Sequence, residues 1–447
     1  MVKVGGNWVN FSFANFSFAK REPAILAALL SISFIVRLLL FSQQGFPSDI
    51  SDFIYWFNTA AAHGIRPFYV IVPSWTDYPP FNIYIFWAAG NLANAAAAFG
   101  IKAVDIVKLV PSLFDMATGL LIYVFVRRQV SFKLALVASA LYVLNPAVMY
   151  DSAVWGQFDA IYTFFLVLAL MLALKSRPKL AAATYAIAIL TKPQSIALLP
   201  VLVVLIYKKN GFRNLIYSIG VFVASIYVVS APFQYLDAAK VVQNSWSNPL
   251  GFLNGVFLTA YSGYKYSSVN AFNLWALWPG LWVSDSGLFI LGWVLFGTLA
   301  AFVCYFLYKR LNDAGDIFAI FCAFMLFFGF FMLPTRIHER YLFPAMAVLA
   351  LMVPFVKRAR PLYVVLTATL LVNEATILYY YIKFPSGVNL TGNPVVIAVS
   401  TINLVMLAYA WVMLWSKRTW LKTEPPPPPP LNETTEQSEE KSYPTPG

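Results

Sequence analysis

Long apolar stretches alternate with short polar segments along most of the chain. A helix needs about 20 apolar residues to cross a bilayer, so this pattern predicts an all-α polytopic membrane protein with about twelve transmembrane helices (range 11–13). We place the spans at residues 22–42, 106–127, 133–149, 158–174, 179–191, 193–207, 213–231, 287–308, 315–334, 341–356, 361–382 and 395–416. The spans on either side of Lys192 are short. They fit only if a polar cavity reaches down to Lys192 or if they form a re-entrant pair.

Basic residues predict the orientation of these helices. With the N-terminus inside, the inner segments hold 20 of the 31 Lys and Arg residues and the outer segments hold nine. This bias places both termini in the cytoplasm. Segment 80–99 is apolar, but spanning there would invert everything after it, so we expect a helix on the outer surface. Two large outer loops follow, at 43–105 and 232–286. The second is rich in aromatic residues and is expected to rest on the membrane interface.

The chain therefore divides into segments of different character. They are a cytoplasmic N-terminal segment (1–21), a first membrane module that includes the first outer loop (22–231), the aromatic outer loop (232–286), a second membrane module (287–416) and a Pro-rich tail expected to be disordered (417–447).

Composition supports the membrane assignment. Of the 447 residues, 60% are hydrophobic and 11% are charged. Soluble globular proteins contain fewer hydrophobic and more charged residues. The net charge of +12 is attributed to basic cytoplasmic loops, and no nucleic-acid partner is expected. Cys304 and Cys322 lie in apolar runs and are interpreted as small hydrophobes rather than disulfide or metal ligands.

Polar and ionisable groups gather in the predicted outer loops. Charge beside a bilayer is energetically expensive, so such groups usually have a function. Asp49 and Asp52 are three residues apart and would share one helix face, although either could serve only as a helix N-cap. Asp77 and Tyr78 precede two prolines, a pattern that also fits a simple helix start.

Two further motifs lie beside apolar helices. Trp155 fits an interfacial connector, but Gln157 and Asp159 lead into an apolar helix and favour a functional interpretation. Lys192 and Gln194 sit between two apolar stretches. Lys192 must therefore snorkel, pair with an acid or face a cavity.

The string TRIHERYLFP at 335–344 places Arg336, His338, Glu339 and Arg340 within five residues. Guanidinium groups bind phosphate in a fork, and imidazole adds a further donor. A charged loop with an internal Glu339–Arg340 pair is the alternative. One histidine beside one glutamate offers too few ligands for a metal.

These motifs resemble those of the GT-C glycosyltransferases, polytopic enzymes that use polyprenyl-phosphate sugars. The motifs follow one another in the same order and lie in loops on the same side of the membrane. The chain is also similar to dolichyl-phosphate-glucose glucosyltransferases and dolichyl-phosphate-mannose mannosyltransferases. In the former, an Asp precedes a Trp by seven residues, as Asp49 precedes Trp56, and Arg340 stands where a Lys is found. The resemblance covers roughly residues 20–350. Its motifs are Pro47-Ser48-Asp49 through Phe53 and Trp56, Gly64, Phe68-Tyr69, Asp77-Tyr78-Pro79-Pro80, Leu144-Asn145-Pro146, Trp155-Gly156-Gln157-Phe158-Asp159-Ala160, Lys192-Pro193-Gln194 and His338 to Pro344.

The resemblance implies a hexosyltransferase without a metal, since most of the family requires none, and no cofactor is expected. A single displacement by the acceptor would make the enzyme inverting. The donor would be a polyprenyl or dolichyl phosphate sugar. The acceptor would be a hydroxyl of a lipid-linked glycan, glycolipid or protein on the extracytoplasmic side. Asp49 is the implied base, with Asp52 a candidate partner. The predicted phosphate ligands are His338 and Arg340, assisted by Lys192 or Arg336. The predicted sugar and acceptor ligands are Asp77, Tyr78, Trp155, Gln157, Asp159, Gln194 and Glu339.

A transporter or flippase of a lipid-linked or sugar substrate is the competing class, and an intramembrane Lys192 and Asp115 would suit it. Against it, the chain shows no internal repeat of the kind that transporters carry, and its polar motifs collect on one membrane side. We further expect a monomer in a prokaryotic plasma membrane, in contact with membrane lipids.

Overall fold

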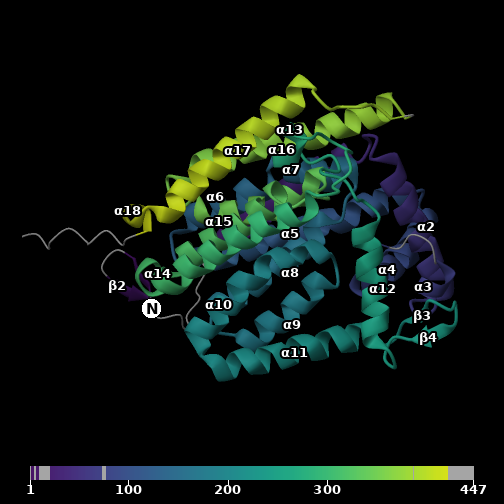
Figure 1. Ribbon diagram of the computed structural model, residues 1–447, viewed down its shortest axis with the longest axis horizontal. Coiled ribbons are helices and arrows are strands. Elements are labelled where there is room, and N and C mark those ends of the chain that lie inside the picture. Colours follow the sequence, from purple (N-terminus) through teal and green to yellow (C-terminus); the bar gives the residue numbers. More distant parts are fainter. Residues whose placement is uncertain (1, 5–6, 10–20, 73–76, 386, 421–447) are drawn as a thin grey trace, which may run out of the picture.

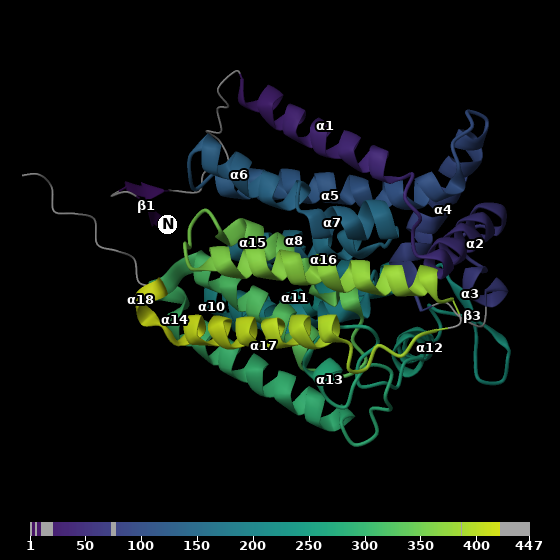
Figure 2. The same ribbon diagram turned by 90° about the horizontal axis from the view of Figure 1, so that it is seen from above.

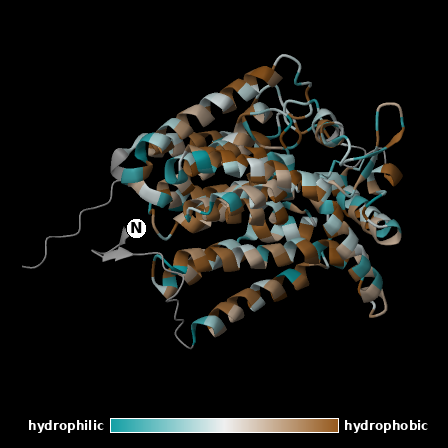
Figure 3. Cartoon of the chain, turned by 90° about the horizontal axis from the view of Figure 1, so that it is seen from below, coloured by the Kyte–Doolittle hydropathy of each residue, from teal (hydrophilic) through white to brown (hydrophobic). Residues whose placement is uncertain are grey.

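The computed structural model describes residues 2–4, 7–9, 21–72, 77–385 and 387–420. Most of the helices run side by side and form one elongated bundle, along which hydrophobic residues predominate (Figures 1, 2 and 3). The bundle helices are α1 (Glu22–Leu40), α5 (Ala103–Arg127), α6 (Phe132–Val143), α7 (Pro146–Met149), α8 (Asp159–Leu174), α9 (Pro178–Ile189), α10 (Leu199–Asn210), α11 (Phe212–Ser230), α14 (Phe289–Met332), α15 (Phe343–Met352), α16 (Ala359–Lys383) and α17 (Pro394–Trp415).

The remaining elements gather at the two ends of the bundle. At one end lie α2 (Pro47–His63), α3 (Phe68–Ile71), α4 (Pro80–Ala97), α12 (Pro249–Ser262), α13 (Leu274–Leu277), β3 (Gln234–Leu236) and β4 (Val242–Asn244). At the other lie β1 (Val2–Val4), β2 (Asn7–Val9) and α18 (Lys417–Trp420) (Figures 1 and 2). The two predicted outer loops therefore meet at one end, here called the α2 end. The predicted disordered tail lies largely outside the described residues.

Every segment predicted to cross the membrane is helical over most of its length. Among the described residues, six helices are long and apolar enough to span a bilayer, or seven if the bent pair Phe132–Val143 and Pro146–Trp155 is one span. The six are α1, α5, α11, α14, α16 and α17. The chain is thus an integral membrane protein, and the count of about twelve spans stays a prediction.

Helix α14 contains two of the predicted spans. Gly315 has φ 74° and ψ −166°, a backbone conformation that glycine adopts without a Cβ clash. The ring of Phe330 then lies 6.1 Å from that of Trp293 and 5.5 Å from that of Phe296, so the chain has folded back on itself. The two halves of α14 are an antiparallel pair, in agreement with the separate spans 287–308 and 315–334.

Helix α4 is the apolar segment predicted to lie on the outer surface. It is not among the helices that qualify as spans. It packs closely on α2 because Gly90 has no side chain: a Cβ there would sit 2.2 Å from the carbonyl oxygen of Phe57. Trp87 and Leu92 face outward and are exposed, as expected for a helix at an interface.

Two small antiparallel hairpins depart from the predicted all-α fold. β1 pairs with β2, and β3 pairs with β4, over three residues each. The backbone N–H of Gln234 also donates to the Arg66 carbonyl, 2.8 Å away, which ties β3 to the first outer loop. Strands of three residues are too short to show a readable alternation of polar and apolar positions.

A buried polar network anchors the segment that leads into the site. The π-helix η2 (Tyr150–Trp155) contains Ser152, whose hydroxyl donates to Asp115 over 2.7 Å. The hydroxyl of Tyr142 donates to the same carboxylate over 2.9 Å, and Arg37 forms a fully buried ion pair with it at 3.3 Å. This network accounts for the intramembrane Asp115 as a structural group, so Asp115 no longer favours a transporter.

Candidate functional site

A cavity of about 740 Å³ lies at the α2 end of the bundle. Its walls come from α2, η2, the Lys192 turn, the second outer loop, the 335–341 loop and the end of α16 with the loop that follows. Twelve of the thirteen predicted site residues line it, and Asp159 is the exception. The structure thus brings together motifs from both membrane modules, as the order of the motifs predicted.

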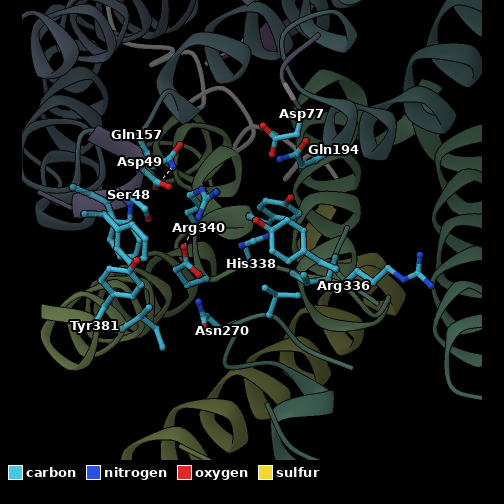
Figure 4. A pocket seen from close by; sticks show the side chains of 18 of the residues that line it. Ser48, Asp49, Asp77, Gln157, Gln194, Asn270, Arg336, His338, Arg340 and Tyr381 are labelled. Atoms are coloured by element: carbon cyan, nitrogen blue, oxygen red, sulfur yellow. Dashed lines mark hydrogen bonds and ion pairs between the residues drawn. The ribbon is translucent and has the colours of Figure 1, made fainter. Parts of the chain in front are cut away.

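Asp49 is held by two donors from the WGQ motif. Its Oδ2 accepts a hydrogen bond from the indole Nε1 of Trp155 at 2.9 Å and another from the side-chain amide of Gln157 (Figure 4). The N-cap of α2 is Phe46, and no side chain caps the helix. The capping alternative is therefore wrong for both Asp49 and Asp52, and the carboxylate of Asp49 is oriented at the cavity wall.

Asp52 lies one turn further along α2, is exposed and also lines the cavity. Although exposed, its carboxyl is partly desolvated by the surrounding protein, which raises its pKa, and the negative charge of Asp49 adds to the shift. Asp49 is therefore the more firmly oriented of the two acids, because both WGQ donors reach it.

Asp159 lies behind the cavity instead of on its surface. Its side chain is fully buried and forms ion pairs with Lys192 Nζ at 3.0 Å and with Arg340 Nε at 3.4 Å. A carboxylate in this position cannot contact a sugar in the cavity. The structure therefore departs from the predicted sugar-binding role of Asp159. Instead, Asp159 forms ion pairs with two cations and fixes their positions.

Lys192 occupies the break between α9 and the 3-10 helix η3 (Pro193–Leu198). Its ammonium lies 5.6 Å from the ring centre of Tyr78 and 5.8 Å from that of Tyr162, and the residue is only 5% exposed. Of the alternatives left open by the sequence, snorkelling is wrong: Lys192 pairs with an acid and also lines the cavity. This agrees with the two short helices flanking it.

Arg336 points away from the centre of the cavity (Figure 4). Its Nε lies 2.7 Å from the carboxylate of Asp285 in the second outer loop. Its guanidinium also lies 4.5 Å from the ring of Phe289 and 4.8 Å from that of Tyr261. These contacts tie the 335–341 loop to the second outer loop, so Arg336 departs from its predicted role as a phosphate ligand.

His338 lies among aromatic rings. Its imidazole is 4.9 Å from the ring of Tyr264 and 5.3 Å from that of Tyr341. Burial lowers the pKa of His338 well below its usual value, and the nearby charges of Arg340 and Lys192 lower it further. The imidazole is therefore neutral near pH 7 and offers one N–H donor, so the cations of this site are Arg340 and Lys192.

Asp77 and Gln194 lie beside each other across the cavity from Asp49 (Figure 4). Burial raises the pKa of Asp77 to about 6, even though Lys192 and Arg340 act to lower it. The hydroxyl of Tyr78 donates to Gln157 Oε1 at 3.2 Å. Glu339 is buried and paired with Arg340. The two cations thus stand among several acids, and Asp77 is one that loses its charge at mildly acidic pH.

Several lining residues were missed by the sequence reasoning. The second outer loop contributes Tyr261, Tyr264, Asn270 and Trp282, whereas the end of α16 contributes Tyr380 and Tyr381. Aromatic residues make up 17% of the chain, so none of the aromatic residues among these stands out in the sequence.

Among the described residues, no three His, Cys, Asp or Glu side chains are arranged to hold a metal ion. Independence from metals and cofactors stays a prediction.

The comparisons with known proteins return distant structural likenesses only. No family model and no curated protein sequence matches the chain. ArnT from Cupriavidus metallidurans, solved bound to undecaprenyl phosphate, superposes with a TM-score of 0.48 and 16% identity over 89% of this chain and 77% of that chain.

An oligosaccharyltransferase of Archaeoglobus fulgidus tethered with an acceptor peptide gives a TM-score of 0.46 and 14% identity, over 88% of this chain and 55% of that chain. The oligosaccharyltransferase AglB of the same organism, in complex with an inhibitory peptide and a dolichol-phosphate, gives 0.46 and 14%, over 90% and 57%. This chain spans little more than half the length of these two. With TM-scores below 0.5, none of the three bears on the chemistry of this cavity.

Proposed function

We propose that this protein is a GT-C-type inverting glycosyltransferase that moves a hexose of the mannose or glucose type from a polyprenyl phosphate to an acceptor hydroxyl. One observation carries the proposal. Asp49 in the first outer loop and Arg340 in the far-separated 335–341 loop line the same cavity in a membrane protein. The motif resemblance of the sequence supports the same class of enzyme.

Arg340 and Lys192 are the groups suited to the donor phosphate. As the bond between the anomeric carbon and the phosphate oxygen breaks, negative charge grows on the phosphate, and fixed cations stabilise it. Asp159 holds both cations from behind, so neither has to be ordered when the donor binds. The neutral imidazole of His338 adds one hydrogen-bond donor beside them.

Asp49 is suited to be the base. A general base must lie within hydrogen-bond reach of the proton that it removes. Trp155 and Gln157 fix its carboxylate at the wall. The acceptor oxygen gives its proton to Asp49 and attacks the anomeric carbon, and the polyprenyl phosphate leaves with the bonding electron pair. A single displacement of this kind inverts the anomeric configuration.

Sugar transfer in liposomes tests the proposal. Purified protein is given farnesyl phosphate hexoses labelled in the sugar, together with simple glycoside acceptors. We expect a new glycosidic bond of inverted configuration. Movement of the labelled donor across the bilayer without a new bond would instead identify a flippase or transporter and would overturn the proposal.

The pKa of Asp77 predicts a pH dependence of donor binding. Below about pH 6 this carboxyl is protonated, which removes one negative charge from the surroundings of the donor phosphodiester. The phosphodiester stays monoanionic, so its affinity is expected to rise several-fold between pH 7.5 and pH 5.5. Titration calorimetry with a farnesyl phosphate hexose and no acceptor measures this.

Asp77→Asn is expected to bind the donor with the low-pH affinity throughout that range, because its amide carries no charge. Asp52→Asn is the control and should retain the pH dependence. An unchanged pH dependence in Asp77→Asn would show that another group is responsible.

A further inference from the structure

Aromatic side chains form two separate walls of the cavity. The first, here called the α16 wall, consists of Phe46, Trp155, Tyr380, Tyr381 and Phe384. The ring of Phe46 stacks on Trp155 at 4.6 Å and 2°, and lies 4.1 Å from the ring of Tyr381. Tyr380 and Phe384 continue the wall, with their rings 5.9 Å apart. Because Trp155 donates to Asp49, this wall leads directly to the base.

The second wall, here called the α14 wall, leads to the phosphate ligands. The ring of Trp293 lies 6.1 Å from that of Phe330, and Phe330 lies 6.4 Å from Tyr341. Tyr341 in turn contacts the imidazole of His338 at 5.3 Å. The two aromatic walls thus end at different functional groups. The α16 wall ends at the proposed base, Asp49, and the α14 wall ends at His338, one of the proposed phosphate ligands.

We propose that the α16 wall is the acceptor subsite, and that it holds an uncharged pyranose ring stacked on the exposed side of Tyr381, whose other side contacts Phe46. The assignment rests on the proposed function, in which the acceptor hydroxyl must lie within hydrogen-bond reach of Asp49. The α16 wall is continuous with Asp49 through Trp155. An acceptor lying on it would face a donor whose phosphate is held by Arg340 and His338.

The charge of the α16 wall selects the kind of acceptor. The charged residues that line the cavity lie on α2, at residue 77, at the Lys192 turn and in the 335–341 loop. The described lining residues from Ile377 to Leu390 carry no charge. A phosphate held against these lining residues would find no counter-charge among them, since Lys383 is exposed and does not line the cavity. A pyranose presents an apolar C–H face to a ring and hydroxyls at its rim, which suits tyrosine rings with a polar edge.

The wall is also open to an incoming molecule. Tyr381 is 39% exposed and Phe384 is 44% exposed, although both line the cavity. The α16 wall therefore runs from the outside of the bundle to the base. A glycan end can enter along it without passing the phosphate ligands.

Substitution of Tyr381 tests the subsite with two small pyranosides, methyl β-glucoside and methyl α-mannoside, as acceptors. Tyr381→Leu is expected to raise the KM of the pyranoside about tenfold, the size of one lost aromatic contact. The KM of the farnesyl phosphate hexose and its slow hydrolysis by water should not change. Tyr381→Phe should restore the acceptor KM because it retains the ring. Tyr305→Leu, an exposed tyrosine of α14 outside the cavity, is the matched control.

The outcomes separate this inference from the proposed function. A rise in donor KM, or slower hydrolysis, in Tyr381→Leu would assign the wall to the donor and overturn the subsite. Preferred transfer to a serine peptide over both pyranosides would contradict the assignment of an uncharged pyranose as the acceptor. If the wild-type protein transfers nothing, the transferase proposal fails, and saturation-transfer NMR tests the subsite separately. Pyranoside binding that Tyr381→Leu weakens about tenfold supports the subsite. Absent binding, or binding that is unchanged in Tyr381→Leu, overturns it.

Discussion

Asp49→Asn is expected to lower the rate of hexose transfer by ~10²–10⁴-fold, the usual effect of losing a general base. The amide preserves the shape of the side chain but does not accept the proton of the acceptor hydroxyl. Donor binding should not weaken, because Arg340 and Lys192 remain in place. The measurement is kcat for transfer from a farnesyl phosphate hexose, with the donor Kd determined by calorimetry on the same preparation.

Asp52→Asn is the matched control for this prediction. Asp52 lies one turn away on the same helix and is exposed, whereas Trp155 and Gln157 both donate to Asp49. Its substitution is expected to change kcat by less than about tenfold. A larger loss in Asp52→Asn than in Asp49→Asn would exchange the roles of the two acids, and full activity in Asp49→Asn would remove this residue from catalysis.

Arg340→Gln is expected to lower kcat/KM by ~10²–10³-fold, the range found when one donor to a developing negative charge is removed. Glutamine has neither the charge nor the forked geometry of guanidinium. Lys192 would remain paired with Asp159, but the buried carboxylate of Glu339 would lose its ion-pair partner, so some loss of stability is also expected. Steady-state kinetics with varied donor measures the loss, and thermal unfolding in detergent checks that the variant is folded.

Arg336→Gln, in the same 335–341 loop, is the matched control for Arg340→Gln. Both arginines lie within five residues of each other, but the guanidinium of Arg336 is paired with Asp285 and directed away from the cavity centre. Its substitution is expected to lower stability and to leave the donor KM close to the wild-type value. Equal losses of kcat/KM in folded Arg336→Gln and Arg340→Gln would contradict the assignment of Arg340 as the phosphate ligand.

The hydrophobic pattern predicted the helices well because lipid-facing helices are apolar over nearly their whole length. The segments around Gly315 illustrate this: both halves of α14 were predicted, and the backbone at Gly315 reverses the chain between them. The three-residue hairpins could not be predicted, since their pairing depends on the neighbouring loops as much as on their own residues.

The site was predictable as a set of residues, but less so in the direction of each side chain. Charged residues beside apolar helices are expected to have a function, and this expectation, together with the order of the motifs, placed Asp49, Lys192 and Arg340 in one group. It could not show that Asp285 captures Arg336, because the two are far apart in the sequence. Nor could the sequence show that Asp159 faces inward. Its partners, Lys192 and Arg340, come from distant parts of the chain and meet it only when the bundle is packed.

Aromatic residues posed a different difficulty. Tyr381 and Phe384 resemble many other rings in an apolar helix and its flanking loop, so no local pattern marks them as part of a cavity. Their position follows from the way in which the end of α16 meets the start of α2, a tertiary contact between Tyr381 and Phe46.

A structure of the Asp49→Asn variant with a bound farnesyl phosphate hexose tests the central claim most directly, because this variant should bind the donor without consuming it. We predict that the phosphate lies against Arg340 and His338, and that the anomeric carbon faces the side chain at position 49. A phosphate bound elsewhere, or a sugar directed away from α2, would contradict the glycosyltransferase assignment.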